Sequence, residues 1–223
     1  MNRKEDIERL LRDIRREVQF TRHAIGQQEL DERTYSAMTN VPRHEFIPEE
    51  LRYRAYDNGP VPIGNNQTIS QPYIVALMTD LLRPKEKDVI LEVGTGSGYQ
   101  AAVLSCLVEK VYSMEIIETL AESARERLQH LGYNNIEVKA VDGYYGWQDF
   151  APFDGIIVTA AAPHIPQPLI DQLKPGGRLV IPVGMPYSFQ QLMVVEKDEQ
   201  GDVTTRNILG VAFVPLTGDH HKP

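Results

Sequence analysis

The residues with the clearest chemical potential lie in the run 90–98, which reads Ile-Leu-Glu-Val-Gly-Thr-Gly-Ser-Gly. Apolar residues typical of a buried strand flank an acidic side chain, Glu92, and three alternate glycines follow. Glycine permits a positive φ and lets a ligand approach the main chain closely. Ligands of parallel α/β sheets bind beyond the carboxyl ends of the strands. The run therefore predicts a ligand-binding turn between a strand and a helix, and a glycine-rich turn without a ligand is the alternative.

The spacing of Gly94, Gly96 and Gly98 discriminates between the possible ligands. A dinucleotide fingerprint has glycines at its first, third and sixth positions, but the sixth residue counted from Gly94 is Tyr99. No lysine followed by serine or threonine completes a phosphate loop here. The pattern resembles the first motif of class I S-adenosylmethionine methyltransferases. That resemblance implies that the three glycines approach the cofactor and that Glu92 lies under the loop near its methionine amino group.

The ends of the next two strands carry acidic residues as well. Residues 111–115 read Val-Tyr-Ser-Met-Glu, and an acid at such a tip, here Glu115, can accept hydrogen bonds from both ribose hydroxyls. The alternative for Glu115 is an acid stabilised by the dipole at a helix N-terminus. Asp142 and Gly143 close the third strand, where the methyltransferase pattern has the acid that meets the adenine amino group. Three matches at successive strand ends favour bound S-adenosylmethionine over an empty turn.

A second motif lies upstream, in a segment over residues 40–71 that is rich in Pro, Gly and Asn and is predicted to be irregular. Its residues 64–72 read Gly-Asn-Asn-Gln-Thr-Ile-Ser-Gln-Pro, which resembles the signature of protein-L-isoaspartate O-methyltransferases, the bacterial ones especially. The family often has Gly where this chain has Asn66, and Asn tolerates a positive φ, so we expect the loop to be retained. Further resembling blocks follow family order and cover nearly all of residues 30–217: Val41-Pro42-Arg43 with Phe46, Ala160-Ala161-Ala162-Pro163, Leu173-Lys174-Pro175-Gly176-Gly177 and Val214-Pro215-Leu216-Thr217.

The resemblance implies an enzyme that transfers a methyl group from S-adenosylmethionine to the free α-carboxylate of L-isoaspartyl residues in damaged proteins and peptides, which initiates repair through a succinimide. That carboxylate has an ordinary pKa of roughly 3.5 and is already a nucleophile at neutral pH, so no general base is needed. We expect Ser70 to be the catalytic residue that orients it through a hydroxyl hydrogen bond. The alternative is that Ser70 caps the following helix. Thr68 and Thr217 are expected at the cofactor, and Ile69, Val214 and Leu216 join Ser70 at the substrate.

Other functions fit part of the pattern. A class I methyltransferase acting on a small molecule or on RNA would explain the strand-end motifs but not the Ser70 loop. A nucleotide-binding module without catalysis is a second alternative, and a nicotinamide oxidoreductase is disfavoured by Tyr99. His164 is a candidate for the edge of the cleft, and His23 is expected to be structural.

The elements that position these motifs alternate regularly from residue 72 onwards. Helices are predicted over 73–82, 99–108, 117–131 and 167–173, and strands over 89–93, 110–114, 136–140, 155–159, 178–183, 191–196 and 208–214. This order predicts an α/β fold with a doubly wound, mostly parallel seven-stranded sheet, Rossmann-like as in class I methyltransferases. Because no helix separates the last two strands, they are expected to form an antiparallel pair at the sheet edge.

The chain is expected to form a single methyltransferase domain over residues 1–223. Residues 1–71 form an N-terminal helical and substrate-loop extension, residues 72–217 the cofactor-binding core, and residues 218–223 a tail. Apolar residues at helical spacing predict an amphipathic helix over 1–25, docked on the domain rather than on a membrane. A second helix is predicted over 31–39 with Asp31 as its N-cap.

Composition limits the remaining possibilities. The 223 residues carry a formal charge of −8, which argues against nucleic acid as a partner because phosphate binding needs a basic footprint. No apolar run is long enough to span a membrane, and the charged N-terminus does not resemble a signal peptide. The single cysteine, Cys106, is expected to be a buried structural thiol in a reducing compartment. We therefore expect a cytoplasmic enzyme, monomeric by family resemblance, without a metal and with His220 and His221 solvated.

Overall fold

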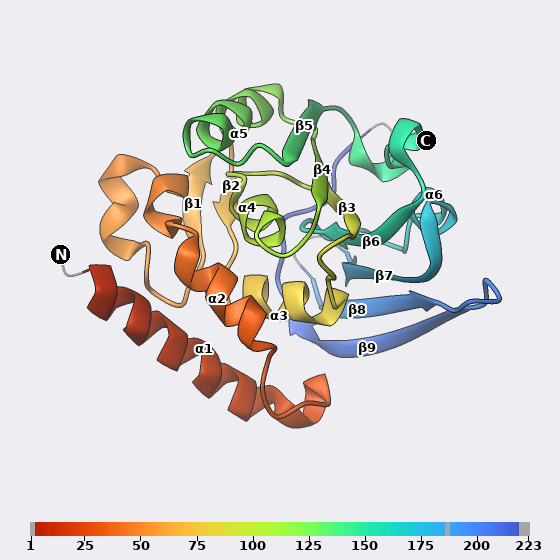
Figure 1. Ribbon diagram of the computed structural model, residues 1–223, viewed down its shortest axis with the longest axis horizontal. Helices are drawn as coiled ribbons and strands as arrows, with labels where there is room; N and C mark the ends of the chain where they lie inside the picture. The colour runs from red at the N-terminus through yellow and green to blue at the C-terminus, as the bar shows by residue number, and fades with distance from the viewer. Residues whose placement is uncertain (1–2, 186–187, 219–223) are drawn as a thin grey trace.

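The computed structural model describes residues 3–185 and 188–218 and is built around one large sheet (Figure 1). Within these residues seven strands follow the order β5-β4-β3-β6-β7-β8-β9. Strands β5 to β7 are mutually parallel, whereas β8 runs antiparallel to both β7 and β9. The strands are β3 (Val89–Val93), β4 (Lys110–Glu115), β5 (Ile136–Ala140), β6 (Phe153–Val158), β7 (Leu173–Gly184), β8 (Gln190–Lys197) and β9 (Val203–Val211). The predicted doubly wound sheet with an antiparallel pair at one edge is confirmed.

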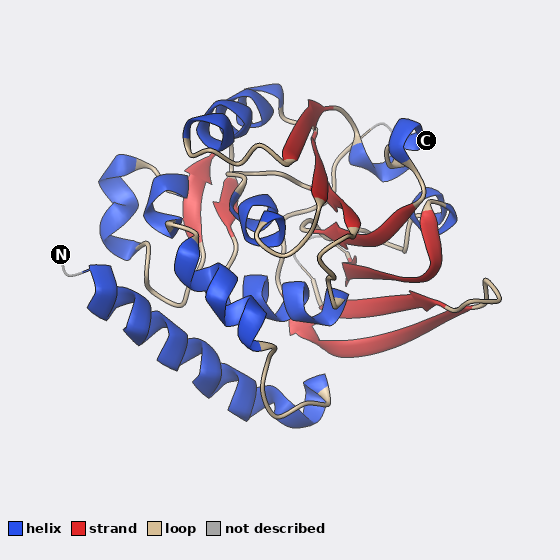
Figure 2. Ribbon diagram, in the orientation of Figure 1, coloured by secondary structure: helices blue, strands red, loops and turns tan. Residues whose placement is uncertain are grey.

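Helices cover the sheet on both sides (Figure 2). The α-helices are α1 (Arg3–Ile25), α2 (Glu32–Asn40), α3 (Pro72–Leu82), α4 (Tyr99–Ser105), α5 (Glu118–His130) and α6 (Gln167–Asp171). Short 3-10 helices are η1 (Arg43–Phe46), η2 (Glu49–Arg54), η3 (Gly143–Tyr145) and η4 (Gln148–Phe150). The sheet order reverses between β3 and β6, so the carboxyl ends of these two strands mark the place where a ligand site is expected.

The core has two layers because successive strand residues point to opposite faces of the sheet. Ile90 and Ile157 belong to the cluster that packs under α1 to α4. Their neighbours Leu91 and Ile156 belong to the second cluster, with Trp147 and residues of α6. Burial on both faces explains the nearly continuous apolar strands in the sequence.

The N-terminal helix α1 is docked as its periodicity predicts. Leu10, Ile14, Val18 and Ile25 are buried, and α1 contacts α2, α3 and β9. The N-cap of α2 is also confirmed, since the Asp31 side chain accepts a hydrogen bond from the Arg33 amide at 2.8 Å.

The segment 40–71, predicted to be irregular, contains more order than expected. Besides η1 and η2 it forms the antiparallel hairpin of β1 (Val61–Gly64) and β2 (Gln67–Ile69). The two residues between the strands, Asn65 and Asn66, have φ angles of 51° and 56°. A two-residue hairpin turn requires such positive angles, and Asn adopts them readily. Asn66 therefore retains the loop as expected.

Other boundaries differ from the predictions for local reasons. The strand predicted over 208–214 is β9, which lies at 203–211. The prediction missed residues 203–207 because they are exposed and mostly polar, as edge strands often are. Helix α4 ends at Ser105 instead of residue 108, and the next apolar residues belong to the turn before β4. Cys106 is exposed at this helix end, which corrects the expectation of a buried thiol. Partial desolvation nevertheless raises the pKa of the Cys106 thiol.

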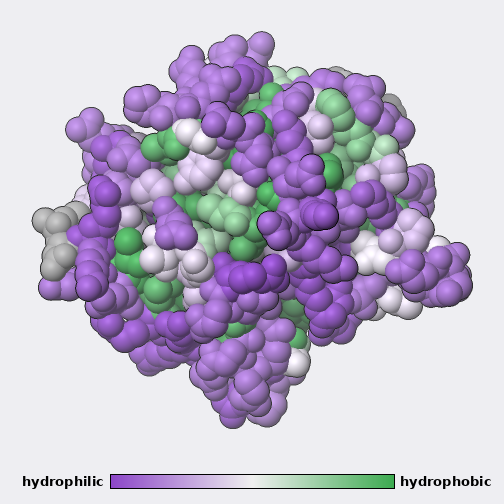
Figure 3. Space-filling model, viewed as in Figure 1, coloured by the Kyte–Doolittle hydropathy of each residue, from purple (hydrophilic) through white to green (hydrophobic). Residues whose placement is uncertain are grey.

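The surface seen in Figure 3 is mostly hydrophilic, with small separate hydrophobic areas. No helix among the described residues is long and apolar enough to cross a membrane. The same residues hold no group of three His, Cys, Asp or Glu side chains placed to bind a metal ion. The tail residues His220 and His221 lie outside the described residues.

Candidate functional site

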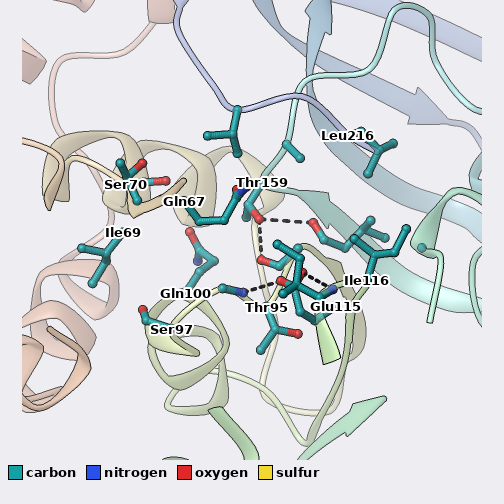
Figure 4. Close-up of a pocket in the computed structure, with 18 of the residues that line it drawn as sticks. Gln67, Ile69, Ser70, Thr95, Ser97, Gln100, Glu115, Ile116, Thr159 and Leu216 are labelled. Atoms are coloured by element: carbon teal, nitrogen blue, oxygen red, sulfur yellow. Dashed lines mark hydrogen bonds between the residues drawn. The ribbon is translucent and has the colours of Figure 1, made fainter. Parts of the chain in front are cut away.

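A cavity opens beyond the carboxyl ends of β3, β4 and β6 (Figure 4). Its empty volume is about 780 Å³, with the open solvent at its mouth included. Its walls come from the glycine loop after β3, the segment between β2 and α3, and the segment after β9. The described lining residues are 67–70, 75, 93–97, 99, 100, 114–117, 143, 159, 160 and 214–217. Glu115 is the one carboxylate among them, and they include no Lys, Arg or His.

Gly94 begins the loop in a conformation that only glycine adopts readily. Its φ is 99°, and a Cβ there would collide with the Thr159 hydroxyl. That hydroxyl donates to the Gly94 carbonyl at 2.6 Å, while the Gly94 amide donates to Met114 at the end of β4 at 2.8 Å. The ends of three neighbouring strands thus hold the start of the loop in one position.

Gly96 and Glu115 form the centre of the site. The Gly96 amide donates to Glu115 Oε2 at 2.8 Å, and the Ile117 amide donates to Oε1 at 3.0 Å. Glu115 is 7% exposed, so its carboxylate is held by two main-chain donors inside the cavity wall. Each carboxylate oxygen can accept a further hydrogen bond, as a ligand with neighbouring hydroxyls requires.

Gly98 has a different role from the other two glycines. It has a φ of 87° at the N-cap of α4 and does not line the cavity. The position that its Cβ would occupy lies 3.2 Å from a methyl group of Leu128. Gly98 therefore allows the close approach of α4 and α5 and supports the loop by packing.

Glu92 lies completely buried beneath the loop and is not part of the cavity lining. Its Oε2 accepts from the Ser113 hydroxyl, which lies 2.5 Å from the Thr95 hydroxyl of the loop. Its Oε1 has no hydrogen-bond partner. Burial raises the pKa of Glu92 to about 8, and the nearby Glu115 charge acts in the same direction. Burial thus favours the protonated form of this carboxyl at neutral pH.

Gly143 lines the cavity, but Asp142 does not. A Cβ on Gly143 would lie 2.5 Å from a methyl group of Val93, so a larger side chain is excluded here. The Asp142 carboxylate accepts from the Tyr144 amide at 2.9 Å and caps η3. Gly218 lies directly against Asp142, because a Cβ on Gly218 would overlap the carboxylate.

The signature segment forms the wall opposite the glycine loop. Thr68, Ile69 and Ser70 all line the cavity, and Ile63 of the same hairpin approaches Gly96, with 3.5 Å between its Cδ1 and the position of a Cβ there. The N-cap of α3 is Gln71, and its side chain makes no capping hydrogen bond. The alternative role of Ser70 as the helix cap is therefore wrong.

The segment after β9 closes the cavity with Val214, Leu216 and Thr217. It pairs with the chain beyond β6, since the Ala161 amide donates to the Val214 carbonyl and the Leu216 amide to the Ala161 carbonyl, both at 2.8 Å. These residues line the cavity, which was expected from the sequence only through family resemblance.

A groove adjoins the cavity on the side of β9. Its wall is largely apolar and includes Ile74, Phe213 and Phe189, which is 73% exposed. Four residues line both hollows: Thr68, Ser70, Thr159 and Val214. The two spaces therefore meet beside Ser70.

Comparison with known proteins gives the family of this chain. A sequence model of the family described as protein-L-isoaspartate(D-aspartate) O-methyltransferase (PCMT) matches residues 19–221. The protein-L-isoaspartate O-methyltransferases 2 of Syntrophobacter fumaroxidans and Nitrosococcus oceani are each 61% identical to this chain. The matches cover 95% of this chain and 86% of the first protein, and 96% of this chain and 97% of the second.

A solved structure agrees with these relatives. A putative member of the family from Plasmodium falciparum, in complex with S-adenosyl-L-homocysteine, has a TM-score of 0.76 at 26% identity. The match covers 97% of this chain and 99% of that one. The chain belongs to the PCMT family. It is a class I, S-adenosylmethionine-dependent methyltransferase that acts on L-isoaspartyl residues in protein repair.

Sequence reasoning missed several lining residues of this PCMT family member. Ile116 is a large apolar residue with 40% exposure at the cavity. Its position directly after the strand-tip acid Glu115 is a signal that could have identified it. Thr159 and Gln100 carry no such signal, because only the fold brings them beside the glycine loop.

The two histidines considered in the sequence analysis, His164 and His23, do not line the cavity. His164 is exposed, and its Nε2 lies 3.0 Å from the Tyr144 hydroxyl. His23 is exposed on the last turn of α1. Neither lines the cavity or the groove.

Proposed function

We propose that this chain methylates the α-carboxylate of an L-isoaspartyl residue at the junction of the cavity and the groove. One observation carries the proposal: Thr68, Ser70, Thr159 and Val214 line both spaces. A peptide lying in the groove can thus present a carboxylate beside Ser70 to a methyl donor held in the cavity.

The residues of the cavity fit S-adenosylmethionine. The glycine cradle at Gly94 and Gly143 leaves no room for side chains, and Glu115 has free acceptor sites for two ribose hydroxyls. Glu92 lies beneath the lining, and its unpartnered Oε1 is the acceptor that remains for a charged amino group, whose positive charge would favour the ionised form of the carboxyl. We propose that these residues hold the cofactor together with Gly96, while Gly98 acts by packing. In this proposal Thr68 and Thr217 close the site. The Asp142 carboxylate contacts the adenine amino group after Gly218 has moved away from it.

The reaction needs orientation more than acid–base catalysis. Bound S-adenosylmethionine would supply a methyl group on a positively charged sulfur, and transfer of that group to a carboxylate oxygen would leave S-adenosylhomocysteine. The carboxylate is ionised at neutral pH, so the absence of Lys, Arg and His from the described lining is compatible with this chemistry.

Ser70 is the residue that we propose for orienting the carboxylate. Its side chain lies at the junction and is not used as a helix cap, so its hydroxyl can donate to the carboxylate oxygen that does not attack. Ile69, Val214 and Leu216 exclude water around the reacting atoms, which strengthens this hydrogen bond. The geometric requirement is strict, because reacting atoms must approach within roughly 3–3.5 Å in line.

The methyl ester is a better electrophile than the carboxylate. The neighbouring amide nitrogen can therefore attack the ester and release methanol as the succinimide closes. Hydrolysis of the ring returns a portion of normal aspartate. This part of the repair needs no further residue of the enzyme.

A pair of peptides tests the proposal. One peptide carries a single isoaspartyl linkage, and the other has the same sequence with normal aspartate. We expect methyl transfer from labelled S-adenosylmethionine to the first peptide only. Equal labelling of both peptides, or of neither, would refute the substrate assignment while leaving the cofactor assignment open to a separate binding titration.

We further propose that the enzyme works as a monomer in the cytoplasm, without nucleic acid or membrane. The formal charge of −8 supports the lack of a nucleic-acid partner, since phosphate binding needs a basic footprint. Turnover that is unchanged by added RNA, and a single monomeric species in sedimentation, are the expected observations.

A further inference from the structure

Arg43 is a completely buried arginine, 0% exposed, with no acidic partner among the described residues. Its Nε donates to the Ala55 carbonyl at 3.0 Å, and its Nη2 donates to the Ser70 carbonyl at 2.8 Å. Its Cζ lies 4.8 Å from the centre of the Tyr99 ring. Burial lowers the pKa of Arg43 to about 10, so the guanidinium is still charged at neutral pH.

These contacts join both walls of the catalytic cavity. Ser70 belongs to the signature segment, and Tyr99 is the first residue of α4, directly after the glycine loop. A weaker contact at 3.5 Å reaches the Gly59 carbonyl ahead of the hairpin. Arg43 therefore links the Ser70 wall to the wall that we propose holds the cofactor.

Such an arrangement is costly to the fold. A buried cation without a counter-ion loses several kcal/mol of hydration, and Nη1 has no hydrogen-bond partner. A planar fork that reaches two carbonyls and an aromatic face in fixed directions is a property of arginine that lysine lacks. The geometry is thus better explained by precise placement than by stability.

We propose that Arg43 is a positioning residue for methyl transfer, which holds the Ser70 main chain at a fixed place relative to the glycine loop. The inference rests on the proposed role of Ser70. Small displacements of an aligned group reduce the rate strongly, so loosening the Ser70 carbonyl lowers kcat. We expect cofactor affinity to change little, because Arg43 meets the cofactor wall at the Tyr99 ring and has no contact with Gly94, Gly96 or Glu115.

The test combines Arg43→Lys with Ser70→Ala and with the double variant. Arg43→Lys is expected to lower kcat for the isoaspartyl peptide about 10-fold, with the affinity for S-adenosylhomocysteine changed less than about twofold. In the Ser70→Ala background the same change is expected to cost less than about twofold, because the group that Arg43 positions is gone. Arg178→Lys is the control. Its guanidinium donates to the Leu81 carbonyl at 3.0 Å and pairs with Glu196, and it does not line the cavity, so the change should affect stability without changing kcat.

Three outcomes would overturn the inference. Additive losses in the double variant would show that Arg43 does not act through Ser70. A parallel loss of S-adenosylhomocysteine affinity would place its effect on the cofactor. If Arg43→Lys fails to fold, Arg43 stabilises the fold as a whole and is not a positioning residue. Failure of the wild-type enzyme to distinguish the two peptides would instead refute the proposed function itself.

Discussion

At the scale of single residues, the position of Ser70 leads to a direct prediction. Ser70→Ala removes one hydrogen bond to a charged group, worth roughly 1.5–3 kcal/mol. We therefore expect kcat/KM for an isoaspartyl peptide to fall about 10- to 100-fold. The melting temperature should hardly change, since Ser70 is not the cap of α3. Steady-state kinetics and thermal unfolding provide the two readouts.

Ser105→Ala is the control for this variant, because its hydroxyl donates to the Ala102 carbonyl at 2.7 Å and does not line the cavity. It should leave kcat/KM unchanged. An unchanged kcat/KM in Ser70→Ala, or a loss that follows from unfolding, contradicts the role given to Ser70.

The raised pKa of Glu92 predicts that the free energy of unfolding depends on pH in an unusual way. Its pKa is about 8 in the folded chain and 4.5 ordinarily, so between these values the folded state holds one proton more than the unfolded state. The free energy of unfolding should then fall by up to about 1.4 kcal/mol per unit of rising pH, and level off above the folded pKa. Glu92→Gln keeps the shape of the protonated acid and should remove this contribution.

Urea unfolding at pH 6, 7 and 8 without cofactor measures the slope. Glu137→Gln, on a half-exposed acid that pairs with Lys110, serves as the comparison and should keep the wild-type slope. If Glu92→Gln shows the same slope as the wild type, Glu92 is not protonated in the folded state.

At the scale of elements, the role of the glycine loop can be tested by comparing the same substitution at two glycines, one inside the loop and one outside it. Gly94 and Gly201 have similar φ angles of 99° and 90°, but only Gly94 has a neighbour where a Cβ would lie. Alanine at either site strains the backbone by roughly 1–3 kcal/mol. Gly94→Ala must also displace Thr159 and the loop, so we expect affinity for S-adenosylhomocysteine to fall about 100-fold or more.

Calorimetric titration separates the two effects. Gly201→Ala lies in the turn between β8 and β9 and should lower stability while leaving affinity unchanged. Equal affinities in the two variants would mean that the loop does not form the cofactor site.

The sequence predicts the elements unevenly, for physical reasons. Strands β3 and β6 are buried on both faces and are recognisable as short apolar runs. The β1–β2 hairpin escapes detection because its strands have four and three residues, and tertiary packing of Val61 and Ile69 stabilises it.

The residues of the site also divide into those that a sequence pattern reveals and those that only the fold brings together. Gly94 and Gly96 follow β3, and Glu115 is the last residue of β4, so their place in the cavity could be predicted from the ends of apolar runs. Arg43 lies in one of the blocks that resemble the family, but no local pattern reports its contact with Ser70 or that of Thr159 with Gly94, because these partners are distant in sequence. The roles of Arg43 and Thr159 become visible only in the folded chain.

At the scale of the whole molecule, α1 supports the site from outside. Most of this helix precedes residue 19, where the family match begins. It packs on α3, whose first turn follows Ser70 and Gln71, and on β9, which leads into the segment that closes the cavity. The helix thus braces the two elements that carry the substrate side of the site, without itself lining the cavity.

This bracing role leads to a prediction about stability rather than catalysis. Ile14 is 0% exposed in the middle of α1, so Ile14→Ala should lower the free energy of unfolding by about 2–4 kcal/mol. Phe20, on the same helix, is 85% exposed, and Phe20→Ala should cost less than about 0.5 kcal/mol despite the larger side chain removed. Denaturant unfolding measures both values, and kcat at a temperature where each variant is folded should match the wild type. A fall in kcat for folded Ile14→Ala would show that α1 acts on the catalytic geometry through α3, and the helix would then belong to the active site's machinery and not to its support.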